Sequence, residues 1–489
     1  MKNLKYWNIE RGVAQVLLST ATLLLAACGG ASTAVSAPAA ANRAPTFTSG
    51  STSAFAENGT AAAYQAAATD ADGNPIVFTI SGGADSARFT ISSTGQLRFV
   101  TAPNFDLPAD SNGDNIYEVQ VSASDGTVAT PLTVSVTVTN DKEGVAVRRV
   151  GTGFAHPVAV APIDSTRALV AEKSGAIYIL DTQTGVRTLL TQIADVASDG
   201  MIALATDSTF ASTGSFFALY ISSNNAVLVN QFLRNPAGPT VPNNFGPAFG
   251  FSATSYGGGG SLALEANGDI LVATSDAAAV GDLAANAQDT ASRFGKVFRL
   301  VKTQGGPVDA APFRYVPVLL AKGVHRPSGI AQIAASGGLL IADAGDQIAE
   351  EIDFLPGGPV LNFGWPFREG TRTIRGTAPA GLTDPVIEYP HVAATATTGQ
   401  GVIGGAIGNA TVPSLLNQFV FADRGGAIFS IGVGVTTQNG SAPSSAVERR
   451  DADFAPDRGA LSRPVAITAS AFGGIFIVDD GGDIFFVNS

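Results

Sequence analysis

The segment Ser255–Asp276 reads SYGGGGSLALEANGDILVATSD and holds the pattern that decides the fold. An apolar run, LALEA, is followed by an Asn-Gly turn and by a second apolar run, ILVAT, which ends in polar residues. Two short apolar runs joined by such a turn are typical of paired antiparallel strands. The four glycines before the first run put no side chain at the entry to this strand pair.

The same pattern of strand, Gly or Ser turn and strand recurs six times in residues 145–489. The copies begin at Val158, Ile202, Leu262, Ile330, Val402 and Val465. Each copy can bury its apolar face only against its neighbours, as in the blades of a ring. The spacing exceeds the roughly 40–45 residues of a minimal blade, so we expect the extra residues to form loops around a site. We predict a six-bladed β-propeller over 145–489.

A different pattern occupies residues 45–142, where short alternating segments are separated by Gly, Asn and Asp clusters. The spacing of segments such as IVFTI and YEVQVSAS fits a sandwich of about seven short strands. Charged residues make up only 14% of the chain, and the helix-favouring Glu/Lys/Leu composition is absent. The predicted fold class is therefore all-β, with an N-terminal β-sandwich followed by the propeller.

The N-terminal residues 1–27 combine basic residues with an apolar run that is too short to span a membrane. This is the layout of an export signal. The run ends in LAAC, which resembles the lipobox of bacterial lipoproteins and implies that Cys28, the single cysteine of the chain, carries lipid. The alternative is a buried thiol behind an ordinary signal. We expect an exported protein, anchored by lipid to the outer membrane.

Residues 28–44 are mostly small, with one proline at Pro38, and we expect them to be a flexible tether. The chain has 28 basic and 40 acidic residues, a net charge of −12. This balance argues against a nucleic-acid partner, because no basic stripe is present to neutralise phosphates. An acidic chain is better suited to binding cations.

The sandwich segment carries acidic residues in the stretches AENG, ATDADGNP, APNFD, VSASDG and VTVTND. In this order they resemble a cadherin domain of the bacterial type over nearly all of 45–142. The resemblance implies two calcium sites, because calcium binds clustered carboxylates that otherwise repel one another. One site consists of Asp70, Asp72 and Asp125 with the linker at Asn42, and the other, at the junction with the propeller, consists of Glu57, Asp106 and Asp141. The alternative is that these Asp and Asn residues only make turns.

Four motifs of the propeller segment resemble the glucose/sorbosone dehydrogenases. They are VAEKSGAIYILD, GMIALATDSTFASTGSFFALYIS, NAQDTASRFGKVFRL and the long stretch that ends in LNFGWPFREG. The resemblance implies a propeller that binds pyrroloquinoline quinone and calcium and oxidises aldose sugars. It also implies cofactor contacts at Gln288 and, through backbone carbonyl groups, at Gly345 and Asp346.

The family's catalytic base is a histidine that precedes paired glycines and removes a proton from the sugar hydroxyl while hydride passes to the quinone. That role needs a group that titrates near neutral pH. Gly259 and Gly260 fill the paired positions, so Gly257 stands where the resemblance places the histidine. The expected base is therefore missing from this position.

A second motif also departs from the family. In GVHRPSG, His325 occupies the family's arginine position and Arg326 its asparagine position. His325, Arg326 and Tyr256 are the candidates for catalytic roles in the central site, and His391 is expected in a pocket-facing loop. For each histidine, a purely structural role remains the alternative.

Two functions stay open on these grounds. The chain is either a membrane-anchored, quinone-dependent dehydrogenase of aldose sugars, or a non-catalytic propeller that binds a glycan or a protein at the cell surface, for example in adhesion. Fold alone does not separate them. A measurement of redox activity with added quinone, calcium and aldoses separates the two functions.

Overall fold

The computed structural model describes residues 41–206, 210–234, 243–252, 256, 258–276, 281–303, 314–391, 399–436 and 441–489. Within these residues the α-helices are single turns, α1 (Phe210–Thr213) and α2 (Val433–Thr436). Short 3-10 turns occur at Ser86–Arg88, Pro413–Leu415 and Ser444–Ala446. No helix of the described chain has the length and apolarity that a membrane crossing requires. The fold is all-β, as predicted.

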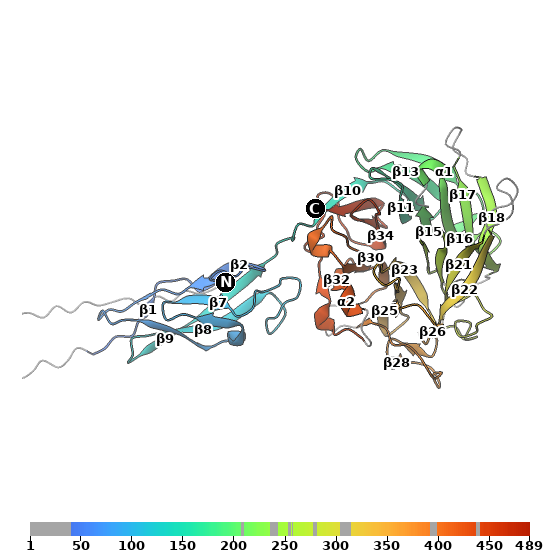
Figure 1. Ribbon diagram of the computed structural model, residues 1–489. Coiled ribbons are helices and arrows are strands. Elements are labelled where there is room, and N and C mark those ends of the chain that lie inside the picture. Colours follow the sequence, from blue (N-terminus) through green and yellow to red (C-terminus); the bar gives the residue numbers. More distant parts are fainter. Residues whose placement is uncertain are drawn as a thin grey trace, which may run out of the picture.

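Six sheets of at least four strands follow one another around a ring (Figure 1). Blade 1 contains β11 (Pro157–Pro162), β12 (Arg167–Glu172), β13 (Ala176–Asp181) and β14 (Arg187–Gln192). Blade 2 contains β15 (Val196–Thr206), β16 (Ser215–Ser222), β17 (Ala226–Leu233) and β18 (Asn243–Ser252). Blade 3 contains β19 (Gly260–Leu264), β20 (Ile270–Thr274), β21 (Lys296–Thr303), β22 (Arg314–Lys322) and the short parallel β26 (Leu361–Asn362).

The second half of the ring repeats this plan. Blade 4 contains β23 (Arg326–Gln332), β24 (Leu339–Ala344), β25 (Ala349–Leu355) and β29 (Ile387–Pro390). Blade 5 contains β30 (Val402–Ile407), β31 (Gln418–Asp423), β32 (Ile428–Gly432) and β33 (Glu448–Arg449). Blade 6 contains β34 (Pro464–Ala469), β35 (Ile475–Asp479), β36 (Asp483–Asn488) and β10 (Ala146–Gly151). A small hairpin, β27 (Arg368–Glu369) and β28 (Arg372–Thr373), extends from blade 4.

Blade 6 closes the ring, because it takes strands from both ends of the propeller segment. β10 pairs antiparallel with β36, with Ala146 opposite Asn488, and Figure 1 shows the C-terminus beside β10. The innermost strands β11, β15, β19, β23, β30 and β34 contact one another in this order, and β34 also contacts β11. The six copies seen in the sequence are therefore the six blades, and each copy begins on or next to an innermost strand.

Apolar side chains fill the space between neighbouring blades. One cluster joins Leu169 and Ile177 of blade 1 to Phe216 of blade 2. The next joins Val229 of blade 2 to Ile270 of blade 3. Strands such as β20 are buried along their whole length, because they are covered on both faces by the adjacent blades.

The N-terminal segment forms two main sheets around one core. The larger sheet contains β2 (Thr52–Ala56), β9 (Ala129–Thr139), β8 (Ile116–Ser124) and β5 (Val77–Gly82), and the smaller contains β3 (Tyr64–Gln65), β7 (Gln96–Phe99) and β6 (Phe89–Ile91). A short pair, β1 (Thr46–Phe47) and β4 (Ala68–Thr69), adds to them. Tyr117 of the larger sheet meets Phe99 of the smaller edge to face, with ring centroids 5.0 Å apart. The segment is a sandwich of short strands.

Candidate functional site

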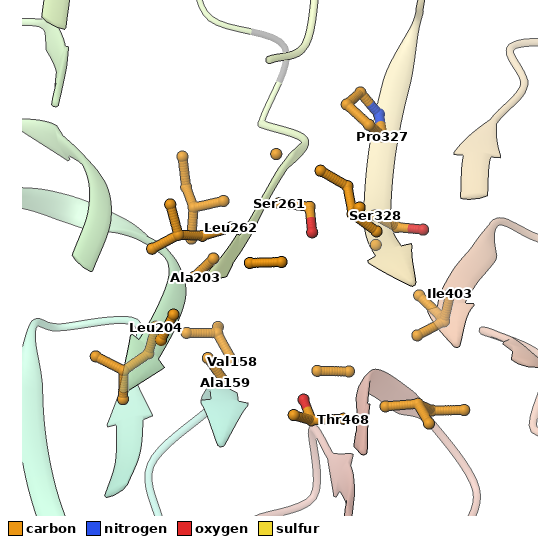
Figure 2. Close-up of a pocket in the computed structure, with 18 of the residues that line it drawn as sticks. Val158, Ala159, Ala203, Leu204, Ser261, Leu262, Pro327, Ser328, Ile403 and Thr468 are labelled. Carbon is orange, nitrogen blue, oxygen red and sulfur yellow. The ribbon is translucent and has the colours of Figure 1, made fainter. Parts of the chain in front are cut away.

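The innermost strands surround a central cavity of about 1570 Å³. Figure 2 shows lining side chains from all six of these strands, and most are small or aliphatic. The labelled examples include Ala159, Ala203, Ser261, Ser328, Ile403 and Thr468. Small side chains on the wall leave the axis of the ring hollow, and the hollow is larger than the roughly 300–1,000 Å³ of an ordinary ligand pocket, so a ligand would fill only part of it.

The charged side chains of the cavity lie mainly at one end, which we call the charged mouth. It is the end at which the innermost strands begin, and in antiparallel blades the turns between the second and third strands reach the same end. The residues of the charged mouth are Lys173, Arg326, Asp346, Glu350, His391, Arg424, Arg463 and Asp480. At the opposite end the charged lining residues are Glu265 and Lys302, beside Ile163 and Phe472.

Positive charge exceeds negative charge at the charged mouth. Arg326 pairs with Asp346 at 3.7 Å, and Arg463 pairs with Asp480 at 3.4 Å. Neither Lys173 nor Arg424 forms an ion pair within the described chain, although the charge of Lys173 helps to lower the pKa of Asp480. These two cations are therefore available to an anionic ligand.

The turn between β24 and β25 is held by two buried glutamates. Glu369 Oε1 accepts hydrogen bonds of 2.8–3.0 Å from four consecutive backbone N–H groups, those of Asp346, Gln347, Ile348 and Ala349. The N–H of Gly345 donates to Glu350 Oε2 at 3.1 Å. Among the described residues, no hydrogen bond reaches the carbonyl oxygens of Gly345 and Asp346. A Cβ at position 345 would lie 1.8 Å from the carbonyl oxygen of Ala349, so only glycine allows this close turn.

His391 and Glu350 form a pair on the wall of the charged mouth. His391 Nε2 lies 2.7 Å from Glu350 Oε1. Glu350 is fully buried, and its Oε2 also accepts the Val402 N–H at 2.9 Å. Burial raises the pKa of Glu350, and the neighbouring amide and His391 oppose that rise. The pocket-facing position expected for His391 is confirmed, whereas Glu350 was not singled out from the sequence.

Arg326 lines the cavity but the preceding residue does not, because adjacent residues point to opposite sides at the start of β23. The His325 side chain is buried behind the wall and stacks on Trp365, with ring centroids 3.8 Å apart. Its Nδ1 lies 2.8 Å from the Ala344 carbonyl oxygen. Burial, together with the nearby Arg326 charge, lowers the pKa of His325 to about 4. The neutral ring thus serves packing, and the expectation that it points into the central site is not met.

Tyr256 and Gln288 also lie off the cavity wall. The Tyr256 hydroxyl oxygen accepts the N–H of Ser275 at 2.9 Å, and burial raises the pKa of Tyr256 above its usual value. The Gln288 carboxamide donates to Asn362 at 2.9 Å and to the Trp365 carbonyl oxygen at 2.7 Å. Both groups are engaged in holding loops together, so the structure places neither in its expected role.

Gly257, the expected position of the base, lies outside the described residues. Its neighbours Gly259 and Gly260 are described, and both are needed for packing. A Cβ on Gly259 would lie 3.0 Å from the backbone of Arg326, and one on Gly260 would lie 3.0 Å from Ile202 Cγ2. This part of the glycine run thus lets blade 3 approach its two neighbours.

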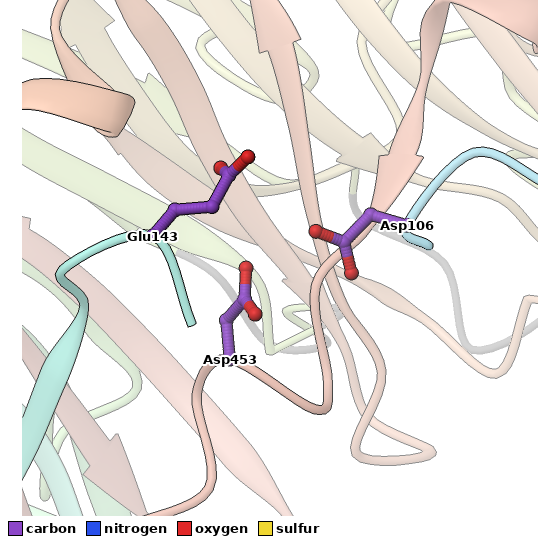
Figure 3. A group of neighbouring side chains, drawn as sticks. All are labelled: Asp106, Glu143 and Asp453. Atoms are coloured by element: carbon purple, nitrogen blue, oxygen red, sulfur yellow. The ribbon is translucent and has the colours of Figure 1, made fainter. Parts of the chain in front are cut away.

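A second cluster of charged groups, the junction cluster, lies where the sandwich meets the propeller. Asp106, Glu143 and Asp453 each bring one carboxylate oxygen to within 4.8 Å of the others (Figure 3). Arg450, of which 2% is exposed, meets all three, at 3.0 Å, 2.8 Å and 2.5 Å respectively, and reaches Glu448 at 3.3 Å. Burial and the adjacent Asp453 raise the pKa of Asp106 to about 8.

The junction cluster differs from the calcium site expected there. Glu57 accepts the N–H groups of Phe105 and Asp141 at 2.7 and 2.8 Å, and so shapes the backbone. The Asp141 side chain is exposed. Asp106 is instead joined by Glu143 and by Asp453 of the propeller, and the cation among them is Arg450.

At the far end of the sandwich the linker contacts two of the expected calcium residues, although the carboxylates of Asp70, Asp72 and Asp125 do not come within 4.8 Å of one another as a group. Asn42 Nδ2 donates to Asp125 at 2.7 Å, and the N–H of Arg43 donates to Asp72 at 2.7 Å. Asp70 Oδ1 accepts the N–H of Asp72 at 2.9 Å. The linker thus folds against these carboxylates.

Comparison with known proteins agrees with this geometry. The family model for glucose/sorbosone dehydrogenases matches residues 154–406, just over half of the 489-residue chain. The sequence has no significant match among curated proteins.

Solved structures share the fold of the propeller. The aldose sugar dehydrogenase from Streptomyces coelicolor in its PQQ-bound form is 19% identical with a TM-score of 0.53, covering 70% of this chain and 98% of its own. The soluble aldose sugar dehydrogenase from Escherichia coli in its apo form is 17% identical with a TM-score of 0.53, covering 70% and 99%. A calcium structure of a Trichoderma reesei family AA12 enzyme is 16% identical with a TM-score of 0.51, covering 71% and 95%. With the family model, the closed ring and the matching motifs, the chain belongs to the glucose/sorbosone dehydrogenase family.

Proposed function

We propose that this chain is a quinone-dependent dehydrogenase of aldose sugars whose active site is the charged mouth. The observation that carries the proposal is the pair of cations there, Lys173 and Arg424, that form no ion pair among the described residues. Pyrroloquinoline quinone is a polycarboxylate, and lysine and arginine bind carboxylates by charge-assisted hydrogen bonds. Family membership and the PQQ-bound structural neighbour support the same cofactor.

The residues of the charged mouth fit both the quinone and calcium. The carbonyl groups of Gly345 and Asp346 offer the hard oxygen ligands that calcium prefers, and neither is used elsewhere in the described structure. Glu369 and Glu350 hold the amide groups of this turn, which keeps the two carbonyl groups in place. When bound, the quinone supplies an acceptor for the hydride of the sugar.

The chain's own side chains would orient the two ligands. Lys173 and Arg424 would bind carboxylates of the quinone, while Asp346 holds Arg326 in place at 3.7 Å. The Arg326 N–H donates to Asp343 Oδ1 at 2.6 Å, which fixes the backbone at the start of β23. The small side chains of the wall leave room for a ligand along the axis.

A pair of lysines on the same cavity provides the test. Lys173→Met removes a cation from the charged mouth, and Lys302→Met removes one from the opposite end. We expect Lys173→Met to weaken quinone binding about tenfold, since hydrogen bonds to charged groups contribute roughly 1.5–3 kcal/mol. Lys302→Met is expected to leave it unchanged. Binding is measured by absorbance titration of the purified protein in calcium, and turnover with a panel of aldoses.

An equal loss of quinone affinity in Lys173→Met and Lys302→Met would contradict the assignment of the site to the charged mouth. A wild-type protein that binds no quinone would overturn the proposed activity. That second result would favour the alternative in which the propeller binds a glycan or a protein without catalysis.

We propose further that the protein is exported and anchored to the outer membrane through lipid on Cys28. Residues 1–40 lie outside the described part of the chain, so the support is the LAAC sequence itself. Cys28→Ser is expected to give a product that is uncleaved or no longer held by lipid. A variant that still partitions wholly into membranes with the mature mass would contradict the proposal.

We also propose that the sandwich binds calcium at Asp70, Asp72 and Asp125. The support is that the linker binds two of these residues at one end of the sandwich, through Asn42 to Asp125 and through the Arg43 N–H to Asp72. Calcium at this position would join the linker to the folded domain.

A further inference from the structure

We infer that His391, positioned by Glu350, is the proton acceptor for sugar oxidation at the charged mouth. This inference rests on the proposed function. It assigns to blade 4 the task for which the family uses a histidine at the position of Gly257.

His391 is the histidine with access to the cavity. The chain has three histidines. His325 is buried behind the wall, against Trp365. His156 is not a lining residue; its side chain is 64% exposed and pairs with Asp480 at 3.0 Å. Only His391 is both on the cavity wall and partly exposed, with 19% of its side chain accessible.

Glu350 determines which ring nitrogen of His391 is available. Nε2 and Oε1 are 2.7 Å apart, close enough for an ion pair although the ring is not aligned for a straight hydrogen bond. Two lone pairs at that separation would repel, so a proton lies between the two atoms, and we place it on Nε2 because the other oxygen of Glu350 accepts two backbone N–H groups as a carboxylate does. Nε2 is buried against the glutamate, whereas the side chain as a whole is 19% exposed on the cavity wall and no hydrogen bond within the described chain involves Nδ1. The Nδ1 lone pair is therefore the one that can accept a proton at the charged mouth.

The surroundings of Glu350 keep the carboxylate in this position. Its other oxygen accepts the N–H groups of Val402 and Gly345, at 2.9 and 3.1 Å. A Cβ on Gly399 would lie 2.4 Å from Glu350 Cγ, so a larger residue there would displace the glutamate. The N–H of His391 donates to the Ile348 carbonyl oxygen, which ties the histidine to the same turn. Glu350 is thus a positioning residue.

The proposed step balances with a quinone as the oxidant. The C1–H bond of the aldose breaks, and its hydride, with the electron pair, passes to the quinone. The anomeric O–H bond breaks as well, its proton moves to His391 Nδ1, and the sugar becomes the lactone. The imidazolium that forms would be stabilised by the negative charge of Glu350 at 2.7 Å.

Nuclear magnetic resonance of the quinone-free protein tests the positioning. With three imidazoles to resolve, ¹⁵N shifts assigned through His391→Gln and His156→Gln report the tautomer of each ring. We expect a proton on Nε2 of His391 in the wild type. In Glu350→Gln the carboxamide N–H₂ faces Nε2 and donates to it, so the proton should move to Nδ1. A wild-type ring protonated on Nδ1, or a tautomer unchanged in Glu350→Gln, would overturn the inference.

Kinetics test the proton transfer itself. His391→Gln is expected to lower kcat about 10²–10⁴-fold, the usual contribution of a general base, with the Kd for quinone within twofold of wild type. The matched control His156→Gln replaces a histidine that is not on the cavity wall, and it should lower kcat far less than His391→Gln does. Melting temperatures verify folding, and Glu350→Gln, which is isosteric and expected to lower kcat at least tenfold, decides the question if His391→Gln does not fold.

The outcomes separate the two proposals. A wild type that binds quinone and oxidises aldoses, with a His391→Gln variant that is equally fast, overturns the role of His391 and leaves the proposed function intact. A wild type that binds no quinone overturns both.

Discussion

The charged mouth and the junction cluster both gather acidic and basic side chains, but in opposite proportions. The charged mouth has four lysine or arginine side chains and three carboxylates, and it opens to the cavity. The junction cluster has Arg450 with four carboxylates, those of Asp106, Glu143, Glu448 and Asp453, and it is largely closed to solvent.

This difference separates a site that can recruit a ligand from one that holds two domains together. At the charged mouth, Lys173 and Arg424 keep hydrogen-bonding capacity that no described side chain uses. In the junction cluster, the donors of Arg450 are shared among carboxylates from the sandwich, the connecting segment and blade 5. Excess buried charge there has to be relieved by a proton, which is why the pKa of Asp106 rises to about 8.

The largest effect is expected from Arg450→Met. The substitution leaves several buried carboxylates without their cation, and breaking buried ion pairs in this way costs roughly 3–5 kcal/mol. The free energy of unfolding of the full chain, from denaturant titration, measures it. The control is Arg449→Met, which removes an exposed pair with Asp451 and should cost less than about 1 kcal/mol. Equal effects would mean that the junction cluster does not hold the domains together.

The next prediction concerns rising pH at the junction cluster. The pKa of Asp106 is about 8 in the folded chain, against an ordinary value of 3.8, so the folded state binds a proton that the unfolded state releases. The stabilisation from Asp106 should be complete below its ordinary pKa and be lost as pH rises through 8. Melting temperatures between pH 5 and 9 should therefore fall less steeply in Asp106→Asn, which mimics the protonated acid. An identical slope in wild type and variant would contradict this.

The stability contributed by His325, behind the wall of the charged mouth, should change with pH in the opposite direction. Burial lowers the pKa of His325 to about 4 from an ordinary value of 6.5. The folded state therefore requires the neutral ring, and its contribution is present above 6.5 and lost as pH falls through 4. Replacing the ring by an untitratable one of similar shape, His325→Phe, should flatten the loss of melting temperature between pH 7 and 4. The same acid sensitivity in the variant would show that other groups cause it.

The smallest effect is expected at the far end of the sandwich. Calcium that binds only the folded chain should raise the melting temperature as its concentration increases. The added free energy of unfolding should reach about 2.7 kcal/mol at a hundredfold excess over Kd. Asp125→Asn should weaken that response, whereas Asp114→Asn, on an exposed turn of the same domain, should not. A wild-type response unaffected by Asp125→Asn would place the calcium elsewhere, for example at the turn of Gly345 and Asp346.

Much of the candidate site was predictable from the motifs. Arg326, Gly345, Asp346 and His391 all line the cavity, as the motif positions implied. His325 was not placed correctly, because a shift of one residue along a strand moves a side chain to the other face. Gln288 was misplaced for a different reason: its motif holds loops together, and in the same motif Lys296 Nζ donates to the carbonyl oxygens of Asn286, Ala287 and Phe294.

The sequence by itself determined the six blades and the all-β fold, because alternating apolar runs and glycine turns are local properties of the chain. Only the tertiary structure decided which charged groups meet. Glu350 reaches His391 from a neighbouring strand end, and Arg450 reaches Asp106 across two domains. Such contacts depend on how loops from separate strands converge at one end of a closed ring, and no periodicity in the sequence records that distance.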